Sequence, residues 1–175
     1  IPSLYQRAGG TEPRYIPLAM ADRYVGVALV NCVLPALVHK LRTGEGQAVE
    51  VPMFETMAQA VLGDHLMGHT FDPPLEAPGY PRHLAAERRP FRTADGYVCA
   101  LIFNDRHWRR FFGVIGDPER IERDARFASV AARTQNASAV YAFLEATFRT
   151  RTTAQWLDAL RVADIPAGPL PRLES

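Results

Sequence analysis

The sequence has 175 residues, of which 47% are hydrophobic, so it can bury one sizeable core or two small ones. Its 20 basic and 19 acidic residues leave a net charge of +1, which provides no long-range field for a nucleic acid or an anionic membrane. The two cysteines, Cys32 and Cys99, lie far apart in apolar stretches, which indicates reduced core residues in a reducing compartment such as the cytoplasm.

The first strong pattern is a long apolar run at residues 25–41, followed by a Thr-Gly-Glu-Gly stop that begins at Thr43. This pattern predicts a helix, in which Pro35 introduces a kink. Because Asn31 and Pro35 interrupt the run, and because no signal peptide is visible, it indicates a buried helix rather than a membrane span.

A single carboxylate, Asp22, stands in front of this apolar run. Its simplest interpretation is an N-cap, because aspartate accepts hydrogen bonds from the N–H groups of a first helical turn. The alternative is a reactive carboxylate that the helix terminus keeps ionised and aims at a ligand. The local pattern alone leaves both interpretations open.

The residue pattern changes several times in the middle of the chain. Residues 47–51 alternate polar and apolar side chains, which predicts a short strand. Residues 53–69 return to helical spacing. The proline-rich stretch from 71 to 81 predicts a linker. After it, Ala94-Asp95-Gly96 lies between two runs of strand-forming residues, which predicts a β-hairpin.

Amphipathic helices dominate the last third of the chain. A first helix, capped by Asn104, is predicted to end at Gly116. Two more are predicted over residues 136–148 and 153–162. The closing stretch at 165–169 is expected to be extended, because its prolines cannot continue a helix.

Several familiar catalytic and metal-binding patterns are missing from the sequence. It contains no phosphate-binding glycine loop, no nucleophile elbow and no cysteine pair with metal spacing. His65 and His69 lie four residues apart, but no third ligand shares their helix face, so no metal site is predicted. His107 is interpreted as a helix-surface residue, and Trp108 and Trp156 as core anchors.

The order of the short motifs closely resembles that of the family III CoA-transferases, also called the CaiB/BaiF family. These motifs are Ala21-Asp22, the segment Arg42–Glu55, Phe91-Arg92-Thr93-Ala94-Asp95-Gly96-Tyr97-Val98, Asp124-Ala125-Arg126-Phe127, Arg133 with Asn136, Thr152-Thr153 with Trp156, and Ile165-Pro166-Ala167-Gly168-Pro169. Each motif is weak alone, but their shared order covers almost the whole chain.

The resemblance implies an α/β fold, present here as a fragment of a Rossmann-like large domain plus a smaller α+β domain. Residues 1–52 would end the first large-domain segment and hold the catalytic Asp. Residues 53–80 would form a linker helix and loop, and residues 81–175 the small domain. Family members form interlocked homodimers. The chain is expected to be part of a longer protein whose main CoA contacts precede Ile1, so the segment alone is expected to be inactive.

By the same resemblance, Asp22 corresponds to the family's catalytic aspartate, the nucleophile that attacks an acyl-CoA thioester and forms an acyl–aspartyl anhydride. Met53 corresponds to a position against the pantetheine end of coenzyme A, although a plain core methionine is an equal alternative. The implied substrates are an acyl-CoA and a carboxylic acid. No metal, nucleic acid or membrane partner is implied.

The family also contains α-methylacyl-CoA racemases, which use a glutamate that falls here on Asn104. Asparagine cannot take up a proton as a base, although neighbouring Asp105 keeps the racemase alternative open. Residues 73–90 hold only Gly79, so the mobile glycine loop of the family's formyl-CoA transferases is absent. A non-catalytic relative is a further alternative.

Overall fold

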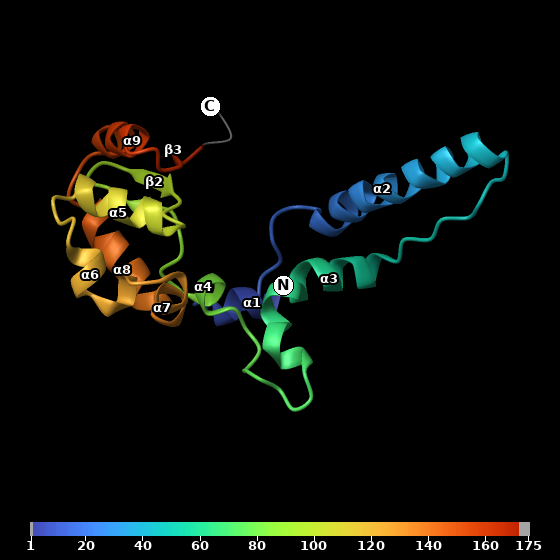
Figure 1. Ribbon diagram of the computed structural model, residues 1–175, viewed down its shortest axis with the longest axis horizontal. Coiled ribbons are helices and arrows are strands. Elements are labelled where there is room, and N and C mark those ends of the chain that lie inside the picture. The colour runs from blue at the N-terminus through green and yellow to red at the C-terminus, as the bar shows by residue number, and fades with distance from the viewer. Residues whose placement is uncertain (1, 172–175) are drawn as a thin grey trace. The chain divides into compact units, whose positions relative to one another are not determined.

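The computed structural model describes residues 2–171 and divides the chain into two units, Ile1–Tyr80 and Pro81–Ser175. We call them the N-terminal unit and the C-terminal unit (Figure 1). The regular elements described in the N-terminal unit are all helices, joined by irregular segments. Its elements are α1 (Pro2–Arg7), α2 (Met20–Thr43), α3 (Met53–Leu66) and the 3-10 helix η1 (Met67–Thr70).

The long helix α2 forms where the apolar run predicts it. It ends at Gly44, whose left-handed backbone (φ 78°) lets its N–H donate to the carbonyl of Lys40. Pro35 lies inside α2, and the helix continues past it. α3 packs against α2 (Figure 1).

The prediction that α2 is a buried helix is wrong for the described residues. Val25 is its only buried residue, and Cys32, predicted to lie in a core, is exposed. The reason is that α3 covers only part of the apolar surface of α2. By length and composition alone, α2 is long and apolar enough to cross a membrane. Core helices of other proteins meet the same two criteria.

The strand predicted at residues 47–51 is also wrong, because residues 45–52 adopt no regular structure. Alternation of polar and apolar side chains makes a segment suitable for a sheet, but a strand forms only when a neighbour accepts and donates its backbone hydrogen bonds. Within residues 2–171, none of the described strands pairs with this segment.

The C-terminal unit combines a small sheet with several helices. Its elements are α4 (Pro81–Leu84), β1 (Phe91–Arg92), β2 (Tyr97–Ala100), α5 (Asp105–Val114), α6 (Arg120–Arg123), η2 (Ala125–Phe127), α7 (Val130–Gln135), α8 (Ala137–Phe148), α9 (Thr153–Val162) and β3 (Ala167–Pro169). The strands are antiparallel in the order β1-β2-β3, with Val98 opposite both Phe91 and Pro169. The structure confirms the predicted hairpin and the helix at 153–162.

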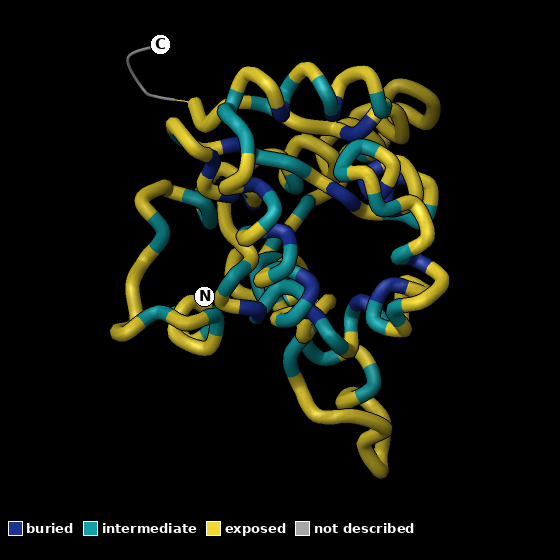
Figure 2. The backbone as a smooth tube through the Cα atoms, turned by 90° about the vertical axis from the view of Figure 1, so that its left-hand side faces the viewer, coloured by how far each residue is buried: buried dark blue, intermediate teal, exposed yellow. Residues whose placement is uncertain are grey.

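Aromatic side chains build the core of the C-terminal unit. Buried positions recur along its helices at the spacing of one helix face (Figure 2). Trp156 is fully buried, and its indole N–H donates to the carbonyl of Phe148 at 2.7 Å. Trp108 is 2% exposed and packs on Phe127 with ring centroids 5.0 Å apart. Both tryptophans are therefore core anchors, as predicted.

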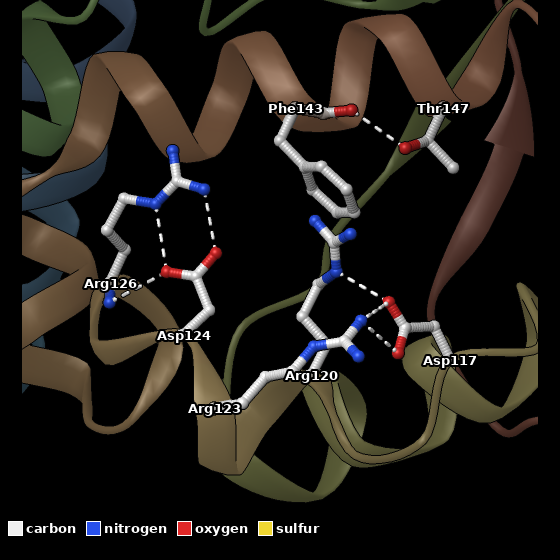
Figure 3. A network of polar contacts seen from close by, with 7 residues as sticks. All are labelled: Asp117, Arg120, Arg123, Asp124, Arg126, Phe143 and Thr147. Atoms are coloured by element: carbon white, nitrogen blue, oxygen red, sulfur yellow. Dashed lines mark hydrogen bonds and ion pairs between the residues drawn. The ribbon is translucent and has the colours of Figure 1, made fainter.

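A group of ion pairs holds the short helix α6 in place (Figure 3). The carboxylate of Asp117 accepts hydrogen bonds from Arg120 Nε at 2.7 Å and from Arg123 at 2.8 Å. Arg120 also lies over the ring of Phe143, 4.8 Å from its centroid. The hydrogen bond from Arg120 is the main reason that the pKa of Asp117 is lowered.

The turn of the β1–β2 hairpin is bonded to the start of α9. Oδ1 of Asp95 accepts from the backbone N–H of Thr153 at 2.7 Å and from its hydroxyl at 2.9 Å. These bonds favour the ionised carboxylate, and the backbone bond is the largest cause of the lowered pKa of Asp95. The Asp-Gly motif predicted the turn, whereas its bond to α9 appears only in the structure.

We expect this contact to stabilise the C-terminal unit in a pH-dependent way. Because the folded state lowers the pKa of Asp95, its contribution is complete above the ordinary aspartate pKa of about 3.9 and is lost as the pH falls through the lower folded value. Asp95→Asn should therefore flatten the acid limb of urea-unfolding stability between about pH 5 and pH 2. Glu119→Gln, at a position without a side-chain cap bond, is the control. An unchanged acid limb in Asp95→Asn would contradict this assignment.

Candidate active site

Asp22 lies in the first turn of α2. The helix begins at Met20, with Ala19 in the N-cap position and no side-chain cap bond. The N–H of Arg23 donates to the carbonyl of Ala19 at 3.3 Å. The N-cap interpretation of Asp22 is therefore wrong, because α2 begins two residues before Asp22.

The position of Asp22 favours a negative charge. The N–H groups of a first helical turn have no acceptor within the helix, and the helix dipole places partial positive charge there. Asp22 is also exposed, so its carboxylate is accessible to a ligand.

Asp22 stands at the edge of an apolar hollow of about 580 Å³ within the N-terminal unit. We call this the Asp22 hollow. It is lined by Pro2, Tyr15, Ile16, Leu18, Ala19, Met20, Ala21, Asp22, Phe54, Met57, Ala58, Val61 and Leu62. Asp22 is the only charged residue in this lining. Its carboxylate therefore lies beside a surface that is suited to binding hydrocarbon.

One face of α3 supplies a whole wall of the Asp22 hollow. The five residues that it contributes follow the spacing i, i+3, i+4, i+7, i+8, which places them on one side of a helix. They are Phe54, Met57, Ala58, Val61 and Leu62. The sequence predicts a helix here, but its spacing is equally typical of a core helix and does not mark these residues as part of a site.

Met53 is the first residue of α3 and is 49% exposed. The alternative of a plain core methionine therefore does not describe it in this structure. Met53 does not line the Asp22 hollow, whereas the next residue, Phe54, does. Its contact with coenzyme A stays a prediction.

The two residues that bear on racemase chemistry both serve the fold of the C-terminal unit. Oδ1 of Asn104 accepts from the N–H of His107 at 2.9 Å and caps α5. Asp105 forms an ion pair with Arg133, whose side chain is 7% exposed and also donates to the carbonyl of Phe127 at 2.7 Å. His107 is buried, so its predicted place on the helix surface is wrong.

The described residues contain no group of three or more His, Cys, Asp or Glu side chains arranged to hold a metal ion. His65 and His69 are engaged separately. Nδ1 of His65 accepts from the N–H of Tyr80 at 3.2 Å, and Nδ1 of His69 lies 3.3 Å from the carbonyl of Glu76. Their four-residue spacing therefore serves contacts with the loop that follows η1.

Comparison with known proteins identifies relatives of the whole chain. A family model described as CoA-transferase family III matches residues 3–175. The chain is 30% identical over 167 residues to the probable fatty acyl-CoA transferase Rv3272 of Mycobacterium tuberculosis, covering 89% of this chain and 42% of that protein. It is 28% identical over 166 residues to the succinate–glutarate CoA-transferase of Agrobacterium fabrum, covering 93% of this chain and 40% of that protein.

Comparison with solved structures identifies the same family. The crystal structure of a hypothetical protein, Rv3272, from Mycobacterium tuberculosis matches with a TM-score of 0.71 and 27% identity, over 99% of this chain and 48% of that one. A CaiB/BaiF family protein from Brucella suis matches with a TM-score of 0.58 and 26% identity, over 98% and 47%. The chain thus spans less than half of each, and the predicted fold class, a fragment of this family's fold, is confirmed.

Proposed function

The chain belongs to CoA-transferase family III, and from that premise we propose that it moves CoA from an acyl-CoA thioester to a carboxylic acid, with Asp22 as the nucleophile. The observation that carries this proposal is an exposed carboxylate in the first turn of α2, at the edge of an apolar hollow. Relatives named as CoA-transferases, among them one named for succinate and glutarate, support it.

In the proposed reaction, an oxygen of the Asp22 carboxylate attacks the carbonyl carbon of the thioester. The C–S bond breaks, CoA leaves as the thiolate and an acyl–aspartyl anhydride remains. The thiolate then attacks the aspartyl carbonyl and releases the first acid as its carboxylate. An acceptor carboxylate attacks the resulting aspartyl-CoA thioester, forms a second anhydride and expels the thiolate. Attack of the thiolate on the acceptor's carbonyl yields the new thioester and restores Asp22.

The N-terminus of α2 would assist this sequence twice. Its dipole stabilises the ionised nucleophile, and its first-turn N–H groups are donors suited to the oxyanion that develops on the carbonyl. We further propose that Met53 contacts the pantetheine end of coenzyme A. Residues 1–52 and 53–80 would then be large-domain segment and linker, and residues 81–175 the small domain.

We also propose that the active protein is an interlocked homodimer located in the cytoplasm, with no membrane or nucleic acid as partner. The chain covers only 42% of the length of its Mycobacterium tuberculosis relative Rv3272. In this proposal, other parts of the full-length protein therefore supply the remaining contacts with coenzyme A.

The racemase alternative is less well supported by the contacts around α5. A racemase needs a second side chain that exchanges a proton with the α-carbon of the thioester. Asn104 cannot do so and is engaged as the cap of α5. Asp105 is paired with the buried Arg133, so using it as a base would disrupt the ion pair.

The direct test is mass spectrometry of the full-length protein after incubation with an acyl-CoA. We expect the peptide that contains Asp22 to gain the mass of the acyl group or of CoA, and we expect Asp22→Asn to gain neither. An adduct on another residue, or none in the wild type, would overturn the assignment of Asp22.

A second measurement separates transferase from racemase. In D2O, a racemase introduces deuterium at the α-carbon of a 2-methylacyl thioester without any acceptor acid. We expect no such exchange, together with CoA transfer that requires a second carboxylate. Deuterium incorporation without an acceptor would favour the racemase instead.

A further inference from the structure

We propose that the Asp22 hollow binds the hydrocarbon chain of an aliphatic monocarboxylic acyl group, and that the enzyme prefers such donors to dicarboxylic ones. This inference rests on the proposed function, because it takes Asp22 as the residue that the acyl carbonyl approaches. It concerns the substrate class, which membership of the family does not determine.

The lining of the hollow leaves large apolar side chains open to a ligand. Phe54 is 80% exposed, Leu18 is 54% exposed and Leu62 is 40% exposed. Such a surface gains about 25 cal/mol for each Å² of hydrocarbon that it removes from water. A volume of about 580 Å³ lies within the usual range for small-ligand sites.

The charges around the hollow oppose a second carboxylate. A dicarboxylic acyl group would carry its distal carboxylate into a wall that contains no lysine, arginine or histidine. The neighbouring Arg23 follows Asp22 on α2 but does not line the hollow. An unpaired carboxylate near apolar walls and near the negative charge of Asp22 is disfavoured both by desolvation and by repulsion.

The test compares donors of equal carbon number in parallel reactions of the full-length protein. Butyryl-CoA is incubated with ¹³C-labelled butyrate and, separately, succinyl-CoA with ¹³C-labelled succinate, so that each thioester exchanges only with its own acid and no unknown acceptor is needed. We expect label to enter butyryl-CoA at least about tenfold faster. Along the series acetyl, butyryl and hexanoyl, kcat/KM should rise by about fourfold for each methylene that the hollow covers.

A charge placed in the wall should change this preference. Met57 lies in the α3 wall of the Asp22 hollow, so Met57→Lys introduces a cation into a lining that otherwise contains none. We expect the butyryl-to-succinyl ratio to fall by about tenfold or more in this variant. Gln59→Lys adds the same charge to an exposed position of α3 outside the lining, and its ratio should stay that of the wild type.

The outcomes separate this inference from the proposed function. If Asp22 carries an adduct but succinyl-CoA exchanges as fast as butyryl-CoA, the substrate class is wrong and the nucleophile stands. If Met57→Lys slows both donors equally, the hollow is filled by another part of the protein and the inference fails. If neither donor exchanges and Asp22 carries no adduct, the proposed function and this inference fail together.

Discussion

Asp22→Asn is expected to abolish CoA transfer by the full-length protein, with kcat lowered by about 10⁴-fold or more. Asparagine keeps the size and the position of the side chain in the first turn of α2, but its amide cannot form the anhydride on which the proposed reaction depends. Losses of this size follow when a covalent nucleophile is removed, because the remaining binding groups supply little of the rate. The measurement is the rate of label exchange between butyryl-CoA and labelled butyrate.

The matched control for this change is Glu55→Gln. Glu55 is an exposed carboxylate in the first turn of α3, in the same unit, and it does not line the Asp22 hollow. We expect Glu55→Gln to retain wild-type exchange. If Asp22→Asn and Asp22→Ala both retain turnover, the nucleophile is misassigned. If the wild type itself shows neither exchange nor adduct, the non-catalytic alternative is favoured.

Trp156→Ala is expected to have the largest effect on stability, about 3–5 kcal/mol. Trp156 is fully buried between Phe111 and Phe148, with ring centroids 6.1 and 4.8 Å away. Truncation leaves a large cavity among rings that cannot close over it, and it removes the hydrogen bond to the carbonyl of Phe148.

Urea unfolding followed by tryptophan fluorescence measures this effect. Both tryptophans, Trp108 and Trp156, lie in the C-terminal unit, so the signal reports that unit alone, and Trp108 remains as the probe in the variant. Val162→Ala, on the same helix at a position that is 85% exposed, should change stability by less than about 0.5 kcal/mol. The stability loss of Trp156→Phe should lie between the losses of Trp156→Ala and Val162→Ala. A loss below about 1 kcal/mol for Trp156→Ala would contradict the described core.

The three longest helices of the C-terminal unit, α5, α8 and α9, could be predicted closely, because each is amphipathic and two of them carry cap signals. α9 begins after Thr152, which forms a capping box with Gln155, and α5 begins after Asn104, whose side chain accepts from the third residue beyond it. These contacts are local in sequence, so the pattern of residues contains them. The strand predicted at residues 47–51 is wrong because a strand depends on a pairing partner, which local alternation of polar and apolar residues does not specify.

The candidate site divides in the same way. The order of motifs along the chain led to Asp22 as the proposed nucleophile, whereas the local pattern left both the N-cap interpretation, which is wrong, and the reactive carboxylate open. Phe54, Met57 and Val61 show the same helical spacing whether they fill a core or line a hollow. Periodicity predicts which residues share a face, but it does not say what that face meets.

The sequence by itself determined the family, the longer helices with the cap of α5, the hairpin turn and the aspartate on which the proposed chemistry depends. All of these follow from residue types at short separations or from their order along the chain. Only the tertiary structure decided that Asp22 borders an apolar hollow, that Asp105 is paired with buried Arg133, and that Asp95 bonds to α9. Each of these joins residues 28 to 58 positions apart, or separate helices, and a contact over that distance depends on how elements pack rather than on their individual propensities.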